Sequence, residues 1–129
     1  MSAVGSSDGR RGLLVKVTCD LDAAERLNQA LTVPATAAAS GVRVGVWLSG
    51  EATSLAVPGF AETLPTLPHA LPVAELRDTL VELAQVTVCA QCARRRDLTE
   101  QSLIAGIRIA GAAAFVEESL ADGVQALVY

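Results

Sequence analysis

The chain has 129 residues, a length that predicts one domain with a hydrophobic core of its own. Hydrophobic residues make up 51% of the chain and aromatic residues only 3%, so the core has to be built from Ala, Val and Leu. The net charge of −4 argues against nucleic acid or an anionic membrane as the main partner.

The start of the chain carries no recognisable targeting signal. Residues 1–12, MSAVGSSDGRRG, are rich in Gly, Ser and Arg, and we expect a flexible N-terminal tail there, ahead of a single domain over residues 13–129. No apolar run is long enough to span a bilayer. Three cysteines, an odd number without an export signal, favour reduced thiols and a cytoplasmic location.

Strand and helix patterns alternate along the rest of the chain. In the first half, the sequence predicts a strand over 13–18, a helix over 22–40, a strand over 42–48, a helical turn over 51–57 and an irregular loop over 57–72. In the second half, it predicts a helix over 72–84, a strand over 86–90 and a helix over 98–106. An extended segment over 106–111, a helix over 112–123 and a strand over 124–129 complete the chain. This alternation is typical of a parallel sheet covered on both faces, so the predicted class is a three-layer α/β domain.

The first predicted helix, over 22–40, carries its own end signals. Asp22 followed by Glu25 is a capping-box pattern at its start, and Gly41 is a stop signal at its end. Pro34 lacks a backbone N–H and clashes with the preceding turn, so we expect it to kink or shorten the helix.

Candidate chemistry collects where the predicted strands end. Ligands of a parallel sheet bind outside the carboxyl ends of its strands. Cys19 follows the first strand, Ser49 and Gly50 follow the second, and Cys89 ends the third. These residues should share one edge of the sheet. Whether Cys19 and Cys89 meet depends on strand order, which the sequence leaves open.

Cys89 lies in the most informative stretch, VTVCAQCARRRDLTE. If a helix begins just after Cys89, its unpaired N–H groups lower the pKa of the thiol, as do nearby guanidinium groups. Those groups belong to Arg94, Arg95 and Arg96, which can also hold an anionic substrate or an acidic partner surface. The alternative is that Cys89 is buried and serves as a small hydrophobic side chain.

Two other interpretations of the cysteines stay open. Cys89 and Cys92 form a C-x-x-C pair after a strand, the arrangement of a thioredoxin-like dithiol. A structural zinc site needs four ligands, and Cys19 with His69 would have to complete the set from loops of unrelated spacing. We therefore expect no metal, and the sequence indicates no cofactor.

The remaining polar residues are interpreted as solvated. His69, the only histidine, lies in the proline-rich segment LPHALP, and nothing in the sequence fixes it near Cys89 as a general base. Glu117 and Glu118 are interpreted as one solvated face of the last helix. The sequence contains no Gly-rich phosphate loop, Ser nucleophile elbow or paired catalytic carboxylates.

Four segments of the chain resemble a known family, and the resemblance covers residues 13–129. The segments are LLVKVT, ASGVRVGVWLSGEA, VTVCAQCARRRDLTEQSLIAG and GAAAFVEESLADGVQALVY. Together they resemble the DsrE/DsrF-like family of small sulfur-handling proteins, which includes the TusBCD sulfur-relay subunits. The resemblance implies a three-layer α/β/α sandwich with a mostly parallel sheet of about five strands. It also implies a homotrimer or homohexamer, or a related hetero-oligomer.

The resemblance also implies a role for Cys89. In sulfur-relay members, the cysteine at the matching position accepts a persulfide sulfur and passes it on, so sulfur donor and acceptor proteins are the expected partners. Cys92 is present in some relatives and absent from others, and it either resolves a persulfide on Cys89 or packs. Cys19 matches no motif position of the family.

Three functions follow as hypotheses. The first is a cytoplasmic sulfur carrier in which Cys89 forms a persulfide, while the arginines at 94–96 stabilise its charge or dock the partner. The second is a non-catalytic oligomeric binding module on the same fold. The third is a dithiol redox protein that uses Cys89 and Cys92.

Overall fold

In residues 11–129, which the computed structural model describes, five parallel strands form one sheet in the order β4-β3-β2-β1-β5. The strands are β1 (Gly12–Val17), β2 (Arg43–Leu48), β3 (Gln85–Cys89), β4 (Arg108–Ala110) and β5 (Val124–Val128). The first three strands pair in sequence order, and the end of the chain returns as β5 to the other side of β1. The expected parallel sheet of about five strands is confirmed.

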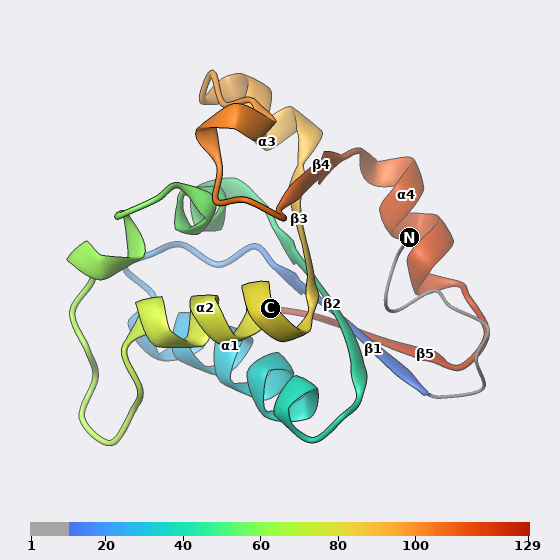
Figure 1. Ribbon diagram of the computed structural model, residues 1–129, viewed down its shortest axis with the longest axis horizontal. Helices are drawn as coiled ribbons and strands as arrows, with labels where there is room; N and C mark the ends of the chain where they lie inside the picture. Colours follow the sequence, from blue (N-terminus) through green and yellow to red (C-terminus); the bar gives the residue numbers. More distant parts are fainter. Residues whose placement is uncertain (1–10) are drawn as a thin grey trace.

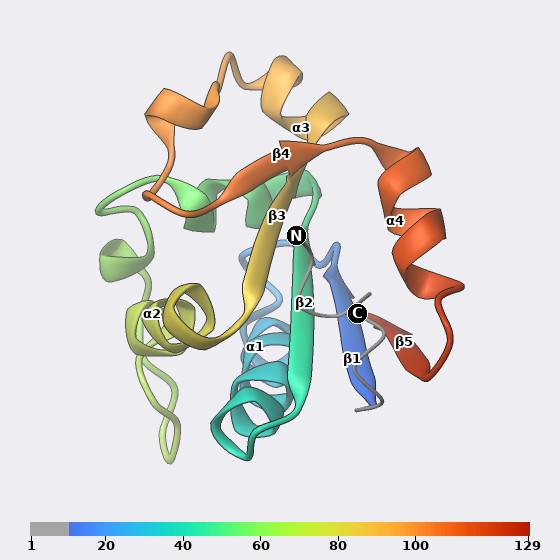
Figure 2. The ribbon, with the colours of Figure 1, turned by 45° about the vertical axis from the view of Figure 1, so that its right-hand side comes forward.

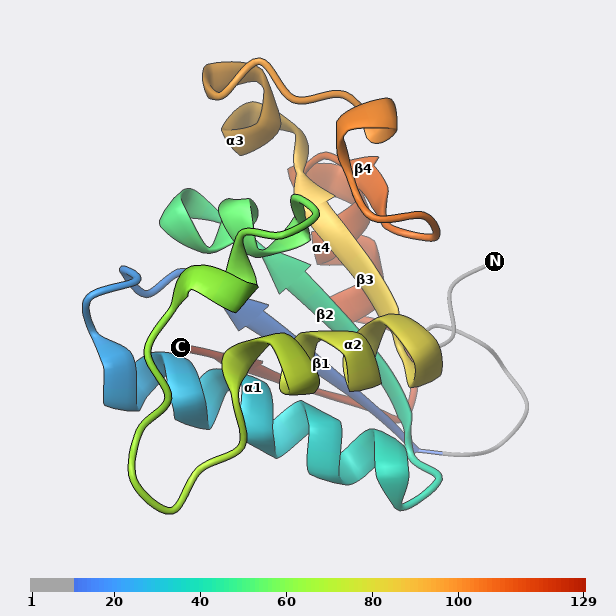
Figure 3. The ribbon, with the colours of Figure 1, turned by 60° about the vertical axis from the view of Figure 1, so that its left-hand side comes forward.

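Helices cover both faces of the sheet (Figure 1). One face carries α1 (Ala24–Ala39) and α2 (Val73–Leu83), which lie side by side, and the other carries α4 (Ala112–Ser119), as Figures 2 and 3 show. A short helix, α3 (Ala90–Arg95), follows β3 directly. Residues 11–129 also contain three 3-10 helices: η1 (Gly50–Ala56), η2 (Ala61–Thr63) and η3 (Glu100–Ser102). The predicted three layers are therefore confirmed.

Small aliphatic side chains fill the core, as the composition predicts. All six residues of β2 are buried, as expected for a strand that has a neighbour on both sides and helices on both faces. The larger core cluster lies between the sheet and the α1/α2 layer. A smaller cluster on the α4 face is centred on Leu14 and Trp47. Each fully buried Val or Leu contributes roughly 2 kcal/mol to stability.

The α1 helix differs from its prediction at its start and its middle. Ala23 is the N-cap residue, without a side-chain cap, so the Asp22 capping box does not form. Instead, Glu51 accepts a hydrogen bond from the backbone N–H of Leu21 at 2.8 Å. Pro34 does not shorten the helix, since α1 continues through it to Ala39, and its side chain lies on the buried face of α1. The predicted stop at Gly41 is confirmed by its positive φ of 90°.

The predicted helix over 98–106 is wrong, since only the single turn η3 forms there. Thr99 and Ser102 form a capping box around that turn, in which the side chain of each accepts a hydrogen bond from the backbone N–H of the other. The chain then leaves helical geometry because the backbone N–H of Ile104 bonds to the carbonyl oxygen of Ala56, which brings Leu103 into the core. The extended segment over 106–111 becomes β4, an edge strand.

Both ends of the described chain differ from their predicted bounds. The expected tail covers residues 1–12, of which 1–10 lie outside the described residues, and Gly12 already belongs to β1. The last helix ends at Ser119, before the expected stop at Gly123, which instead lies in the turn into β5 with a φ of 78°. None of the helices in residues 11–129 has the length and apolar character needed to cross a membrane.

Candidate functional site

The carboxyl edge of the sheet brings two of the candidate residues next to each other. Cys89 ends β3, and the preceding residue Val88 pairs with Leu48 of β2. Ser49, the residue after Leu48, is therefore beside Cys89. Side chains alternate between the faces of a strand, so Ser49 lies on the same face as Trp47, under α4, and Cys89 shares that face. The Ser49 hydroxyl is buried and has no hydrogen-bond partner among the described residues.

Cys89 is a partly exposed thiol whose pKa is lowered. It is the N-cap residue of α3 and keeps an extended backbone. Partial burial raises the pKa of Cys89, but interactions with the backbone N–H of Cys92, the Cys92 thiol and the backbone N–H of Gln91, together with the charge of Lys16, outweigh it. A lowered pKa increases the fraction of thiolate, which is the nucleophilic form.

Cys92 lies deeper than Cys89 and is contacted by two N–H donors. Its side chain is buried, in the first turn of α3. The backbone N–H of Gly50 donates to Cys92 Sγ at 3.2 Å, and Arg95 Nη1 lies 3.9 Å from the same sulfur. The structure therefore brings both sulfurs of the C-x-x-C pair to the junction of β2, β3 and α3.

The three arginines at the end of α3 and just after it, Arg94, Arg95 and Arg96, have different surroundings. Arg94 is exposed. Arg95 donates through Nη2 to Gln91 Oε1 at 3.1 Å while its Nη1 approaches Cys92. Arg96 donates through Nη1 to the carbonyl oxygen of Cys92 at 3.2 Å. The positive charge that lowers the pKa of Cys89 is that of Lys16 on β1, and not that of the arginines as the sequence predicted.

Cys19 lies apart from Cys89. It follows β1, and β2 separates that strand from β3. Cys19 is 5% exposed and belongs to the larger core cluster together with Val17, on the α1 side of the sheet. Burial raises the pKa of its thiol. Cys19 is therefore a packing residue in this arrangement, whereas Cys89 lies on the opposite face of the sheet.

A connected set of aromatic and charged side chains covers the α4 face next to Cys89. Lys16 Nζ lies 4.7 Å from the ring centroid of Phe115, and that ring meets Trp47 edge-to-face with 5.4 Å between centroids. Trp47 Nε1 donates to Glu118 Oε1 at 3.1 Å. Arg108 forms an ion pair with the other carboxylate oxygen of Glu118 and lies 5.6 Å from the Trp47 ring.

Glu118 corrects the interpretation of the last helix. Glu117 is exposed as expected, but Glu118 is only 7% exposed. It can be buried as a carboxylate because Trp47 and Arg108 both donate to it. A signal for this face was present in the sequence, since alternation along LLVKVT places Lys16 on the face opposite Val15 and Val17. The partners on other elements carried no local signal.

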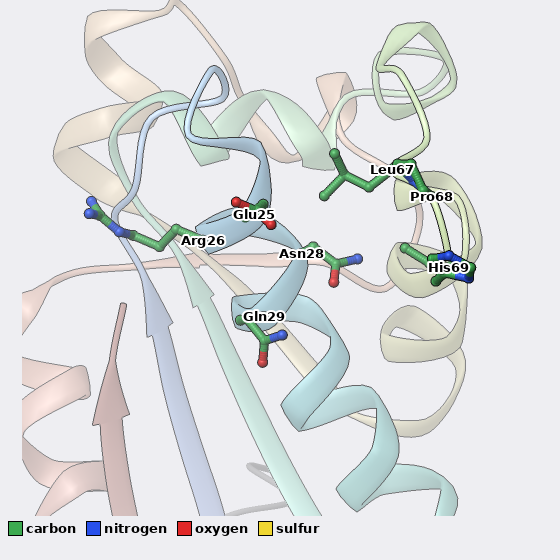
Figure 4. A pocket seen from close by; sticks show the side chains of 8 residues that line it. Glu25, Arg26, Asn28, Gln29, Leu67, Pro68 and His69 are labelled. Carbon is green, nitrogen blue, oxygen red and sulfur yellow. The ribbon is translucent and has the colours of Figure 1, made fainter.

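His69 and the loop around it form a separate hollow. A cavity of about 680 Å³ lies between α1 and residues 67–70. Asn28 points from α1 toward this loop, whereas Arg26 points away (Figure 4). His69 is exposed, and its loop lies at the end of the molecule opposite α3 in all three ribbon views. In residues 11–129, no three or more His, Cys, Asp or Glu side chains are grouped to hold a metal ion.

Comparison with known proteins agrees with this fold. The model of the DsrE/DsrF-like family matches residues 15–128. The chain belongs to this family. Membership of the DsrE/DsrF-like family suggests a function related to sulfur relay. None of the curated proteins matches the chain.

Solved structures share the fold of this DsrE/DsrF-like chain at low sequence identity. The YchN protein from E. coli is 15% identical, with a TM-score of 0.72 over 93% of this chain and 99% of that one. BT1422 from Bacteroides thetaiotaomicron is 14% identical, with a TM-score of 0.63 over 96% and 99%. MTH1491 from Methanobacterium thermoautotrophicum is 9% identical, with a TM-score of 0.59 over 93% and 99%. BT1422 and MTH1491 are described as proteins of unknown function. At these identities the likeness shows the fold alone.

Proposed function

We propose that this DsrE/DsrF-like protein is a sulfur carrier that forms a persulfide on Cys89. The Cys89 thiolate attacks the outer sulfur of a donor persulfide, R–S–SH. A new S–S bond forms at Cys89 while the S–S bond of the donor breaks, so the products are Cys89–S–SH and the donor thiolate R–S⁻. Attack by an acceptor thiolate on the outer sulfur of Cys89–S–SH then passes the sulfur on and restores the thiolate.

The observation that carries this proposal is the lowered pKa of a partly exposed thiol at the carboxyl edge of the sheet. Thiolate fraction and access control the rate of attack on sulfur. Cys19 has neither property, since it is buried and its pKa is raised. The exposed Arg94 lies within two turns of Cys89 and offers a positive charge for docking an acidic partner surface.

The test is sulfur loading followed by mass analysis. The full chain is incubated with glutathione persulfide, alkylated before reduction and mapped by peptide mass spectrometry. A variant with Cys92→Ser is loaded in parallel, so that a persulfide on Cys89 has no neighbouring thiol. In the Cys92→Ser variant we expect one additional sulfur atom on the peptide that holds Cys89, released by a thiol reductant.

Two further variants make the loading test specific. Cys89→Ser should abolish loading and leave the fold intact, since Ser and Cys have similar shapes at this partly exposed position. Cys19→Ser is the matched control, with loading equal to that of the unmodified chain. Sulfur retained on Cys89→Ser, or no sulfur on any variant that keeps Cys89, contradicts the carrier function.

We propose further that the carrier acts as a homotrimer or homohexamer in the cytoplasm, with sulfur donor and acceptor proteins as partners. Apolar side chains exposed on α4, at its C-cap and on β5 support subunit contacts, namely Val116 at 52%, Leu120 at 77% and Val128 at 64% exposed. Light scattering of the purified chain tests the assembly, and a monomer at all concentrations contradicts it. The same surface favours a second candidate function, a non-catalytic oligomeric binding module, if Cys89 does not load.

A further inference from the structure

We propose that Cys92 resolves the Cys89 persulfide and releases its outer sulfur as hydrosulfide, so that the site can release sulfide as well as carry sulfur. The proposal rests on the loading of Cys89 proposed above and adds a fate for the loaded sulfur. Three features of the described residues support it: the positions of the two cysteines, the donors on Cys92 and the difference in burial between the two sulfurs.

The positions of the cysteines favour contact between their sulfurs. Cys89 is the residue that precedes α3, and Cys92 is the third residue of that helix. Side chains at these two positions lie next to each other across the first turn. The Cys92 side chain points toward the end of β2, the strand beside β3, because the backbone N–H of Gly50, just after β2, donates to Cys92 Sγ. The Cys92 thiol also acts as a hydrogen-bond donor to Cys89 and helps to lower the pKa of Cys89.

Two donors place the Cys92 sulfur for a reaction. The Gly50 N–H at 3.2 Å fixes the sulfur, and the guanidinium of Arg95 at 3.9 Å supplies a positive charge beside it. A positive charge next to an attacking sulfur stabilises the negative charge that it carries once its proton has left. Arg95 is itself held in place by its bond to Gln91 at 3.1 Å.

The difference in burial selects which sulfur Cys92 attacks. Cys92 is 6% exposed, whereas Cys89 is partly open to solvent. The added sulfur of a Cys89 persulfide therefore extends toward the open side, away from Cys92. Attack from the buried side meets Sγ of Cys89 first and leaves the outer sulfur free to depart into water. Attack on the outer sulfur would instead move the persulfide to Cys92.

The step balances without any further reactant. The Cys92 sulfur forms a bond to Cys89 Sγ, and the bond between Cys89 Sγ and the outer sulfur breaks. The electron pair of the broken bond and the proton of Cys92 leave with the outer sulfur, so Cys89–S–S⁻ and Cys92–SH give a Cys89–Cys92 disulfide and HS⁻. The Cys92 sulfur is oxidised to the disulfide level, Cys89 Sγ keeps its oxidation state, and the outer sulfur is reduced to hydrosulfide. The reaction is a single turnover.

The experiment measures hydrosulfide and mass together. The reduced full chain is mixed with glutathione persulfide, hydrosulfide is trapped with monobromobimane over time, and the protein mass is recorded after removal of the donor. We expect the unmodified chain to release one hydrosulfide per chain and to lose two hydrogen atoms, with Cys89 and Cys92 joined in one peptide pair. We expect Cys92→Ser to keep the added sulfur on Cys89 and to release hydrosulfide at least roughly tenfold more slowly.

Controls separate this proposal from the carrier function. Cys19→Ser should behave like the unmodified chain, and Cys92→Ala repeats the test in case the serine hydroxyl disturbs the buried position. A stable persulfide on Cys89 of the unmodified chain, a persulfide found on Cys92, or hydrosulfide release by the two Cys92 variants as fast as by the unmodified chain overturns the resolving step while the carrier function stands. Failure of every chain with Cys89 to take up sulfur overturns both.

Discussion

The indole N–H of Trp47 donates to Oε1 of Glu118 at 3.1 Å, which joins the middle strand of the sheet to α4. Trp47 is 1% exposed, and the second carboxylate oxygen of Glu118 is paired with Arg108. Arg108 also donates through Nε to Thr87 at 2.7 Å. The layer that covers the Cys89 face is therefore held by one buried carboxylate with donors from two strands.

Replacement of Glu118 by Ala should destabilise the protein by about 2 kcal/mol, because the buried indole N–H loses its acceptor and Arg108 loses its counter-charge. The value lies at the lower end for a buried pair, since a third of the Arg108 side chain is exposed to water. Chemical unfolding measures the loss, and the fluorescence of Trp47, the only tryptophan, reports it directly.

Glu118→Gln is the control for charge, because the amide oxygen still accepts from Trp47 while the ion pair is lost. Its stability should fall between that of Glu118→Ala and that of the unmodified chain. Glu117→Ala, on the exposed neighbour, should leave stability unchanged within about 0.5 kcal/mol. Equal losses for Glu117→Ala and Glu118→Ala would contradict the buried role of Glu118.

The elements that the sequence predicted well are those with a strong local pattern. The stretches VRVGVWL and VTVCA are apolar runs of strand length, and both became buried central strands. Gly41 ends α1 as predicted because it follows the last helical turn, where a positive φ is needed. The segment 98–106 failed because its backbone bonds to Ala56, a contact made by tertiary packing and not by local preference.

The site was predictable only in its position along the chain. The rule that chemistry gathers at the carboxyl ends of parallel strands located Cys89 and Ser49 correctly at one edge. The separation of Cys19 from Cys89 depends on strand order, which has no local signal. The roles of Lys16 and Gly50 likewise depend on neighbours that lie more than thirty residues away in the chain.

The end of α1 gives a prediction on backbone conformation. Gly41 has a φ of 90°, and the backbone N–H of the next residue, Val42, closes the helix end by bonding to Ala37 at 3.1 Å. Gly41→Ala should cost about 1 kcal/mol in the free energy of unfolding, because an L side chain is strained at this φ. Gly111→Ala is the matched control. Gly111 has a φ of −95° and open space for a Cβ atom, so its substitution should be tolerated.

Glu62 and Arg77 give a prediction on pH dependence. Arg77 is buried and donates to both carboxylate oxygens of Glu62, at 3.1 Å and 2.7 Å. The Arg77 hydrogen bonds lower the pKa of Glu62. A carboxyl group whose pKa is lower in the folded state adds stability above its ordinary pKa of 4.5, and this stability is lost as the pH falls through the lowered folded pKa.

Glu62→Gln should therefore be less stable than the unmodified chain at neutral pH, and the difference should shrink as the solution is acidified below the ordinary carboxyl range. Urea unfolding at a series of pH values measures it. Glu82→Gln is the control, since Glu82 is an exposed glutamate of the same helix as Arg77. A difference between Glu62→Gln and the unmodified chain that stays constant down to strongly acidic pH would rule out this origin.

Lys16 gives the prediction that bears most directly on the thiol. Its ammonium group is held over the ring of Phe115, 4.7 Å from the centroid, on the face that Cys89 shares. The other nearby cation of that face, Arg108, is already paired with Glu118, so Lys16 supplies the charge that favours the Cys89 thiolate. Removal of this charge by Lys16→Met should raise the pKa of Cys89.

The rate of Cys89 alkylation by iodoacetamide, followed against pH, measures this change, because only the thiolate reacts. The midpoint for Lys16→Met should lie at higher pH than that of the unmodified chain, and alkylation near neutral pH should be slower. Lys16→Arg keeps the charge and should keep the midpoint. Added salt should narrow the gap between Lys16→Met and the unmodified chain, since Lys16 is partly exposed and its field is screened. A midpoint that does not move in Lys16→Met would show that the backbone and Cys92 lower the pKa of Cys89 without help from Lys16.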